Sequence, residues 1–415
     1  MSRAMKDSGI PWIGEIPEGW KLCRIKDCTD IVMGQSPDGD SISSEPIGFL
    51  FMQGNAEFTE KYPNPTLYCQ NPNKLSRVGD ILMSVRAPVG ALNISDKIYG
   101  IGRGLCSIKN INIDKSYLWY YLLKSSVDFD YYGNGSTFSA ITVSSLNNFP
   151  LVLPSISEQQ RIAEFLDRKC AEVDEMIALQ EKIVEELKAY KQSVITEAVT
   201  KGLNPAVPMK DSGIEWIGQI PEHWEVKPIK YIKSKEKNSF ADGPFGSNLK
   251  SEHFVENGDV LVIESGFITT GKFIYKDFKT ITKEHFETIK RSECKAKDII
   301  IAKIGANYGM SGELPVLDKP SVVSGNSLKI TLDNKKYLNP IFVYAMMTAK
   351  SNKGFLDLVQ ENAQPALSLS GLNNFRLPSA PIEEQQAIAE YLDKKCSEID
   401  KLISIKLSKI ESLKE

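Results

Sequence analysis

Two blocks of this sequence occur twice, and the duplication constrains the fold more than any other feature. The opening block, MKDSGIPWIGEIPEGWKLCRIK at residues 5–26, returns at residues 209–230 as MKDSGIEWIGQIPEHWEVKPIK. A second block beginning LNNF, at residues 146–174, returns at residues 372–400. The insert between the two blocks is longer in the second half, and similarity inside the inserts is faint. Self-similarity of this kind indicates repeated structural modules, so we expect two related frames around two divergent inserts. The alternative is a duplication that serves stability alone. Such a duplication would not explain why the repeated blocks stay similar while the inserts between them diverge.

The second block has the pattern of a long helix. Ser157 is the expected N-cap with Gln160 as its capping-box partner, and Gly202 followed by Pro205 ends the pattern. Between them, apolar residues recur along one face. This stripe comprises Ile162, Leu166, Cys170, Val173, Ile177, Val184, Leu187 and Val194.

The second copy of this helix carries the same stripe but is shorter. Its apolar positions are Ile388, Leu392, Cys396, Ile399, Ile403, Ile410 and Leu413. The copy ends at Glu415, which aligns with Ala189, so it has no counterpart of YKQSVITEAVTKGL. Since apolar stripes are buried in stable proteins, we predict that the two helices pair with each other. The alternative is that each helix docks onto its own globular domain.

The inserts have a different pattern, with short apolar runs bounded by Gly and Asn that are typical of strands. We expect strands at residues 80–85, 107–109, 298–303 and 328–331. Short helices are expected at residues 117–123 and 340–347. Each insert is therefore predicted to be a compact α+β domain.

The bulk composition excludes several classes of protein. No apolar run is long enough for a signal peptide or a membrane span, so we expect a cytoplasmic protein. The seven cysteines are scattered and only three histidines occur, so no metal site is expected and the thiols are predicted to be reduced. The net charge of −3 argues against a generic nucleic-acid coat protein. DNA binding would then require basic side chains to be concentrated on one face of the protein.

Together these blocks resemble the specificity subunits of type I restriction–modification systems. The resemblance rests on the repeated SGIxWIGxIPExW openings, the paired LNNF…EQQxIAExLDxKCxExD helices, and GPFGSNLK at residues 243–250. It implies two globular target-recognition domains in a pseudo-twofold arrangement, separated by two long antiparallel helices that form a coiled-coil spacer. The implied division is residues 1–157 and 204–382 for the recognition domains, with residues 158–203 and 383–415 as the spacer helices. The short second helix departs from the family pattern and leaves the completeness of the coiled coil open.

The resemblance also implies a function without a catalytic site. Each recognition domain would read one half of a bipartite target in double-stranded DNA, and the helices would set the unread gap. The implied partners are two methyltransferase subunits, with restriction/translocase subunits joining for cleavage. S-adenosylmethionine, ATP and magnesium are expected only in those partner subunits, so no cofactor is expected in this chain.

Candidate DNA-binding residues are loop side chains that can hydrogen-bond to base edges or phosphates. They are Gln35, Ser36, Arg86, Arg103, Ser136, Thr137, Phe138, Ser247, Lys250, Lys303, Asn307 and Gln364. Arg86 and Lys303 are the strongest, because each follows a strand that begins Asp-Ile, while Arg103 is a candidate for phosphate. Ordinary solvated loop side chains are the alternative for each position. Candidate partner-binding residues are helix positions expected to be exposed beside the stripes, namely Gln159, Arg161, Arg168, Gln385 and Lys394.

Other functions fit the sequence less well. Residues 266–272 match a phosphate-binding loop up to its lysine, but Phe273 replaces the required Ser or Thr, and an aromatic strand is expected to follow. A DNA methyltransferase-like enzyme would need an NPPY or DPPY motif, which the sequence lacks. A coiled-coil assembly scaffold with protein-binding domains remains the alternative from another class. The paired tryptophans of each opening block are expected to clamp each domain onto its frame rather than to stack on bases.

Overall fold

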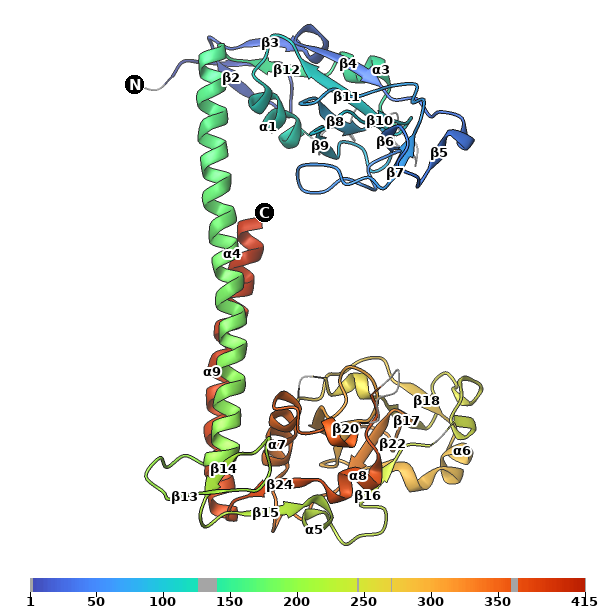
Figure 1. Ribbon diagram of the computed structural model, residues 1–415, viewed down its shortest axis with the longest axis vertical. Helices are drawn as coiled ribbons and strands as arrows, with labels where there is room; N and C mark the ends of the chain where they lie inside the picture. Colours follow the sequence, from blue (N-terminus) through green and yellow to red (C-terminus); the bar gives the residue numbers. More distant parts are fainter. Residues whose placement is uncertain (1–2, 126–139, 245, 270, 360–364, 415) are drawn as a thin grey trace. The chain divides into compact units, whose positions relative to one another are not determined.

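The computed structural model describes residues 3–125, 140–244, 246–269, 271–359 and 365–414, in two compact units. Unit 1 comprises residues 1–175 and unit 2 comprises residues 176–415. Figure 1 traces the chain through both units. The boundary falls within the long helix α4 (Ile156–Lys201). The division into two recognition domains and two spacer segments therefore stays a prediction, and each unit is described by itself.

Unit 1 combines a small frame with two four-stranded sheets. In the frame, β1 (Met5–Asp7) pairs with β2 (Glu15–Pro17), and β3 (Lys21–Arg24) pairs with β12 (Pro150–Leu153). The first sheet has the order β4 (Thr29–Met33), β11 (Leu105–Asn110), β8 (Ile81–Ser84), β9 (Leu92–Ile94). The second has the order β10 (Gly100–Ile101), β6 (Phe49–Met52), β7 (Leu67–Cys69), β5 (Ile42–Ser43). Two short helices, α1 (Lys115–Ser125) and α3 (Val143–Asn147), precede β12 and α4.

Unit 2 repeats this plan. Its frame pairs β13 (Met209–Asp211) with β14 (Gln219–Pro221), and β15 (Glu225–Pro228) with β24 (Arg376–Ser379). Its first sheet has the order β16 (Phe240–Asp242), β23 (Ser327–Ile330), β20 (Ile299–Ala302), β21 (Ser311–Glu313). Its second has the order β18 (Lys279–Ile281), β17 (Val260–Ile263), β22 (Ser321–Val323), β19 (Glu293–Cys294). The helices are α5 (Ile229–Ile232), α6 (Lys283–Thr288), α7 (Asn339–Ser351), α8 (Leu369–Asn374) and α9 (Ile382–Lys414).

The first sheets of the two units are equivalent strand for strand. In unit 1, β4 pairs antiparallel with β11, which also pairs with β8. In unit 2, β16 pairs antiparallel with β23, which also pairs with β20. The predicted strands and short helices of both inserts are confirmed within a few residues at each end. The α+β fold class is confirmed, and the duplication extends into inserts whose sequences are barely similar.

Repeated aromatic residues tie each frame together, as expected for a clamp. The Trp12 ring stacks on Phe149 at 5.6 Å between centroids, and Trp216 stacks on Phe375 at 5.5 Å. Both phenylalanines are the last residue of an LNNF block. The sequence-distant blocks therefore meet in each unit because one supplies the indole and the other the ring that covers it.

The second tryptophan of each opening block fixes the start of a long helix. The Trp20 indole N–H donates to Glu158 Oε2 at 3.0 Å, and the Trp224 N–H donates to Glu384 Oε2 at the same distance. Helix α4 starts at Ile156 and not after Ser157, which corrects the expected N-cap. The Ser155 carbonyl accepts the first backbone bonds of the helix, so the helix begins earlier than the sequence pattern indicated.

The last part of α4 pairs with α9 inside unit 2. Lys191 Nζ lies 2.6 Å from Asp400 Oδ1, and Lys414 Nζ lies 3.1 Å from Glu181 Oε1. As residue numbers rise on one helix they fall on the other, so the pair is antiparallel. The first turns of α9 also pack on the globular part, because Leu392 belongs to the same apolar cluster as Trp224. The apolar stripe of α9 therefore packs in both of the expected ways, against the other long helix and against the globular part of its own unit.

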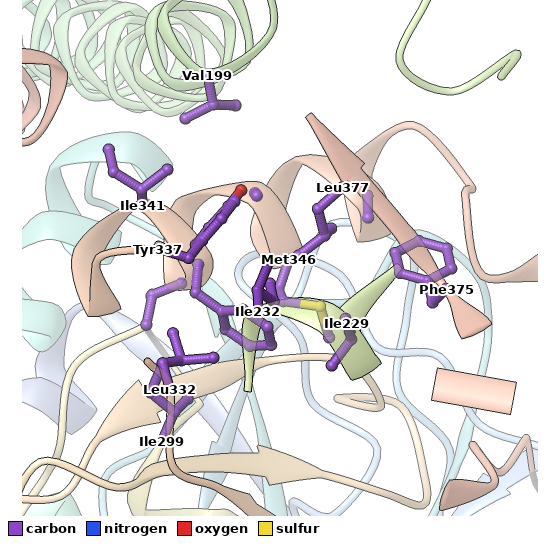
Figure 2. Packing of buried hydrophobic residues seen from close by; sticks show 14 of the residues in the cluster. Val199, Ile229, Ile232, Ile299, Leu332, Tyr337, Ile341, Met346, Phe375 and Leu377 are labelled. Atoms are coloured by element: carbon purple, nitrogen blue, oxygen red, sulfur yellow. The ribbon is translucent and has the colours of Figure 1, made fainter. Parts of the chain in front are cut away.

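The largest apolar cluster joins α4, the frame and α7 in unit 2. Figure 2 shows Val199 of α4 on the side of this cluster formed by Ile341 and Tyr337. No helix in the described ranges is long and apolar enough to cross a membrane.

Candidate nucleic-acid interface

Three loops meet at one end of the first sheet in unit 1, namely the loop after β4, the loop after β8 and the loop before β11. The loop after β4 is held by the Gly34 N–H, which donates to the Leu105 carbonyl at 2.9 Å, and by the Gln35 N–H, which donates to Ile101 at 3.0 Å. A Cβ on Gly34 would lie 2.2 Å from the Gly102 carbonyl oxygen. Only glycine permits this approach, so Gly34 lets the loop that carries Gln35 lie against the loop that carries Arg103.

The neighbouring loop residues add polar groups that the sequence analysis missed. Gln53 Nε2 donates to the Ser36 hydroxyl at 2.6 Å, and Asn73 Nδ2 donates to the Ser36 carbonyl at 3.0 Å. The Gln53 side chain is exposed. Gln53 follows a strand and Asn73 lies in an Asn-rich loop, so only their shared contact with Ser36 identifies them. An exposed amide beside a hydroxyl is suited to hydrogen bonds with adenine or with phosphate.

The two predicted arginines, Arg86 and Arg103, lie on loops at the same end of the sheet. Arg86 is exposed two residues after the end of β8 and forms an isolated bridge with Ala140. Arg103 is exposed between Gly102 and Gly104, just before β11. The structure therefore brings Gln35, Ser36, Arg86 and Arg103 onto adjoining loops. Ser136, Thr137 and Phe138 lie outside the described residues.

Unit 2 has the same three loops at the same end of its first sheet. A Cβ on Gly243 would lie 1.9 Å from the Ser324 carbonyl oxygen, so Gly243 takes the place of Gly34. The Lys303 N–H donates to the Asn326 carbonyl at 2.9 Å. Asn307 is exposed on the loop after β20, while Gln364 lies outside the described residues.

The GPFGSNLK segment continues from this loop to Lys250. The Lys250 N–H donates to His253 Nδ1 at 3.0 Å, and His285 Nε2 hydrogen-bonds the Asn248 carbonyl at 2.9 Å. The two imidazoles stack with centroids 4.0 Å apart. Lys250 is exposed, whereas the side chain of Ser247 lies outside the described residues. The stacked histidines therefore fix the segment that presents Lys250.

The expected equivalence of Lys303 with Arg86 is wrong by one residue. The strand pairings align Ala302 with Ser84, so Lys303 is equivalent to the buried Val85, and Ile304 to Arg86. The isolated bridge between Ile304 and Ala366 matches that between Arg86 and Ala140. A shift of one residue moves a side chain to the opposite face of a strand.

Lys303 is accordingly buried, with 8% of its surface exposed. Its Nζ lies 3.9 Å from Asp242 Oδ2, and Arg291 also pairs with Asp242. This arrangement ties the end of β16 to the end of β20 and does not present the ammonium group to a DNA groove. Lys303 is therefore corrected from a base-contacting candidate to a residue that joins two loops.

Lys350, at the end of α7, holds the loop that carries Asn307. Its Nζ donates to the Ala306 carbonyl at 2.7 Å and to the Tyr308 carbonyl at 2.8 Å, and it lies 4.1 Å from the Tyr308 ring centroid. Partial burial lowers the pKa of the Lys350 ammonium. Because the two carbonyls flank Asn307, this single ammonium anchors the backbone on both sides of Asn307.

Two of the predicted partner-binding residues are not on the surface. Gln159 and Gln385 are 1% and 0% exposed. Gln159 accepts from the Asp114 N–H at 2.8 Å and donates to the Pro154 carbonyl at 2.9 Å. Gln385 accepts from the Leu338 N–H at 2.9 Å and donates to the Ala380 carbonyl at 2.8 Å. Each buried amide therefore joins its helix to its own domain, which corrects the expectation that these side chains are exposed.

The other partner-binding candidates are exposed. Arg161, Arg168 and Lys394 all lie on the helix surface, and the Arg168 guanidinium lies 5.7 Å from the Phe165 ring centroid. Their role in assembly stays a prediction. Among the described ranges, no group of three or more His, Cys, Asp or Glu side chains is placed to hold a metal ion.

A duplicated frame with two α+β inserts, each carrying polar loops at the same end of its first sheet, defines a two-module architecture. The family described as "Type I restriction modification DNA specificity domain" matches residues 17–189 and 221–412. The chain belongs to this family.

The chain is also similar to individual proteins of known sequence or structure. The chain is 38% identical over 192 residues to a putative type I restriction enzyme MjaX specificity subunit from Methanocaldococcus jannaschii, covering 45% of this chain and 44% of that relative. It is 24% identical over 406 residues to the MjaVIII specificity subunit of the same organism, covering 96% and 90%. The crystal structure of the HsdS subunit from Thermoanaerobacter tengcongensis is 36% identical over 40% of this chain and 39% of that one, with a TM-score of 0.35. The chain thus spans less than half of the first relative and most of the second.

Proposed function

We propose that this chain is the DNA-reading specificity subunit of a type I restriction–modification complex and has no catalytic site of its own. The observation that carries the proposal is the repetition of the loop cluster. Two sheets with the same strand order each present three loops from the same end, on frames built from the repeated sequence blocks. Each loop cluster would read one half of a bipartite target.

The chemistry of the loops supports contact with duplex DNA. Guanidinium groups pair with guanine or phosphate, and amides pair with adenine. Arg86, Arg103, Gln35, Lys250 and Asn307 are the exposed side chains for these contacts. With a net charge of −3 over the whole chain, affinity must come from these local groups and from partner subunits. We expect weak DNA binding by the isolated chain.

Methylation and cleavage would be performed by the partners. Two methyltransferase subunits would dock on the repeated frames, because two equivalent frames offer two equivalent sites. Restriction/translocase subunits would join for cleavage, and S-adenosylmethionine, ATP and magnesium would be held by these partner subunits. The complex would act in the cytoplasm, where the chromosome is accessible.

The direct test is to co-express the chain with its methyltransferase subunit and to map methylated bases across the host genome. The expected result is one motif with two specified halves around a fixed unspecified gap. A stable complex that adds no sequence-specific methylation would instead support the scaffold alternative.

Lengthening the paired helices should lengthen the gap in the target. Seven residues inserted between the two ion pairs, after Glu185 in α4 and after Ser408 in α9, add about 10 Å of helix and keep both pairs in register. At about 3.4 Å per base pair, the gap should grow by about three base pairs. Methylation mapping of the insertion variant measures this, and an unchanged gap would contradict the spacer role of the helices.

Replacing Lys350 by methionine should weaken recognition of one half of the target only. The variant keeps the apolar stem but frees the Ala306 and Tyr308 carbonyls, so the loop that carries Asn307 loses its anchor. We expect methylation at the cognate site to fall between about tenfold and a hundredfold, with relaxed bases confined to one half-site. Lys350→Arg should restore specificity, because a guanidinium can donate to both carbonyls. Lys235→Met, at an exposed lysine of the same unit, is the control.

A further inference from the structure

Unit 2 has no arginine at the two positions where unit 1 presents one beside its first sheet. The strand pairings make Ile304 the equivalent of Arg86 and Gly325 the equivalent of Arg103. Arginine is among the commonest readers of guanine in the major groove. The structure brings a different arginine of unit 2, Arg291, to this end of the sheet.

Arg291 comes from outside the first sheet. It lies on the 3-10 turn η6 (Lys290–Ser292), which follows α6 and precedes β19 of the second sheet. Buried neighbours fix this turn in place. Ile289 packs in an apolar cluster with strands of the second sheet, and the Ser292 hydroxyl donates to the Asp242 carbonyl at 2.8 Å. The turn is therefore anchored on both sides of Arg291, and one of these anchors is the end of β16.

The Asp242 carboxylate orients the Arg291 side chain. Asp242 is the last residue of β16, and its Oδ1 pairs with Arg291 Nη2. Its Oδ2 lies 3.9 Å from Lys303 Nζ. The Asp242 side chain is 9% exposed, whereas the Arg291 side chain is 62% exposed. One part of the guanidinium is thus held by a buried acceptor, and the rest stays accessible at the end of the sheet where the loops of Gly243 and Asn307 begin.

This arrangement does more than join two elements. An ion pair with an exposed arginine adds little to stability, and the Ser292 hydroxyl already joins η6 to β16. Arg291 and Lys303 share the single carboxylate of Asp242, so two positive groups and one negative group leave a net charge of +1. The strand pairings make Met33 of unit 1 the equivalent of Asp242. A feature that differs between two inserts on the same frame is what a residue that sets specificity requires.

We propose that Arg291 is a specificity-determining residue of unit 2, which donates to a guanine of its half-site, and that Asp242 is its positioning residue. This role rests on the proposed function and adds a residue and a base to it. A guanidinium carries five N–H donors, so the group can bond Asp242 and still present two donors to guanine O6 and N7. Holding the side chain before DNA binds reduces the conformational entropy that is lost in the complex. Phosphate is the other acceptor that a guanidinium binds, and it carries no sequence information.

The test maps methylation by the complete complex, in which the full chain is co-expressed with its methyltransferase subunit. Arg291→Ala should relax one specified G·C pair in one half-site and leave the other specified bases and the gap unchanged. Discrimination at that pair should fall between about fivefold and a hundredfold, as measured with the purified complex on duplexes that carry each base pair there. Lys290→Ala, at a neighbouring exposed lysine that pairs with Glu287, is the matched control and should keep the original motif.

Arg291→Lys separates a guanine contact from a phosphate contact. Lysine keeps the positive charge but has no planar fork that can bond Asp242 and guanine together. The variant should therefore be as relaxed at the G·C pair as Arg291→Ala. A uniform loss of methylation in Arg291→Ala, restored together with the original motif in Arg291→Lys, would overturn the assignment to a base and show a phosphate contact.

The positioning role of Asp242 is tested by a double-mutant comparison. Asp242→Asn should relax the same G·C pair and no other. In the Arg291→Ala background it should cause no further loss of discrimination at that pair, because its effect acts through Arg291. Asp242→Glu, which keeps a negative charge beside Lys303 but displaces the carboxylate, should do the same where Asp242→Asn fails to fold. Additive effects, or relaxation at several base pairs, would overturn the positioning role.

Two negative outcomes have different meanings. An unmodified complex that adds no sequence-specific methylation would overturn the proposed function and the role of Arg291 with it. An unmodified complex with a bipartite motif, every base of which is retained in Arg291→Ala, would overturn the role of Arg291 alone.

Discussion

A chain whose residues 25–149 are replaced by residues 229–375 should direct methylation to a palindromic target. Both frames would then carry the recognition domain of unit 2. The half-site now specified by unit 1 should disappear, and the half-site of unit 2 should occur twice, in inverted orientation around an unchanged gap.

The physical basis of this result is the equivalence of the two frames. The graft joins at Arg24 and Pro150, which face each other across β3 and β12, just as Pro228 and Arg376 do across β15 and β24. The contacts that must cross the joins are also equivalent. The grafted Leu338 N–H replaces that of Asp114 as the donor to Gln159.

A tyrosine contact is conserved across the graft in the same way. The Tyr120 hydroxyl donates to Asp167 at 2.7 Å, and the Tyr344 hydroxyl donates to Asp393 at 2.9 Å. The grafted Tyr344 can therefore bond Asp167 of α4. Because the acceptors Gln159 and Asp167 lie in the repeated helix block, the donor domain brings an equivalent donor to each of them.

The measurement is genome-wide methylation mapping after co-expression with the methyltransferase subunit. Circular dichroism and gel filtration first establish that the graft folds and assembles. The reciprocal graft, residues 25–149 in place of 229–375, should give the palindrome of the other half-site. Retention of the original bipartite target by a folded, assembled graft would contradict the assignment of one half-site to each insert.

The frame could be predicted from sequence because its two blocks each occur twice in the chain. The Trp12–Phe149 and Trp216–Phe375 stacks join blocks that any internal comparison finds. The common strand order of the inserts could not be found in this way. Many sequences satisfy the same alternation of buried and exposed strand positions, so the two inserts share a sheet while their residues diverge.

The site predictions that failed did so for two physical reasons. Lys303 was misaligned with Arg86 because the strand register, which is set by pairing with β23, is invisible in one strand alone. The sequence predicts that Gln159 and Gln385 are exposed, because polar helix positions usually face water. Their amides are instead satisfied by backbone groups of a neighbouring element, and no local pattern reports such long-range partners. The loop positions of Gln35, Ser36, Arg86 and Arg103 could be predicted because turns beside strands have strong local signals, and their contact with DNA stays a prediction.

Removing the Asp298 carboxylate should destabilise unit 2 more than any surface change. Asp298 is buried, accepts from the Lys295 N–H at 2.9 Å and the Thr331 hydroxyl at 2.5 Å, and lies 3.4 Å from the buried Lys329 ammonium. Asp298→Ala leaves that ammonium without its counter-ion inside the sheet. Breaking a buried ion pair in this way costs about 3–5 kcal/mol of unfolding free energy.

Unit 1 provides an internal control, because Asp80 occupies the equivalent position without a lysine. Asp80 accepts from the Arg77 N–H at 3.0 Å and from the Ser107 hydroxyl at 2.6 Å, and Ser107 is the equivalent of Lys329. Asp80→Ala removes hydrogen bonds but leaves no buried charge without a partner. We therefore expect a smaller loss of unfolding free energy, about 1–3 kcal/mol.

The two losses can be measured separately by hydrogen exchange of peptides from β20 and β8, since each strand reports the opening of its own unit. The double variant Asp298→Ala, Lys329→Met should recover most of the stability lost in Asp298→Ala, because it removes the buried charge together with its partner. Equal losses in the two units, or no recovery in the double variant, would show that the carboxylate acts through its backbone hydrogen bond and not through the ion pair. The expected inequality follows from the divergence of the inserts, in which the same sheet position holds serine in one unit and lysine in the other.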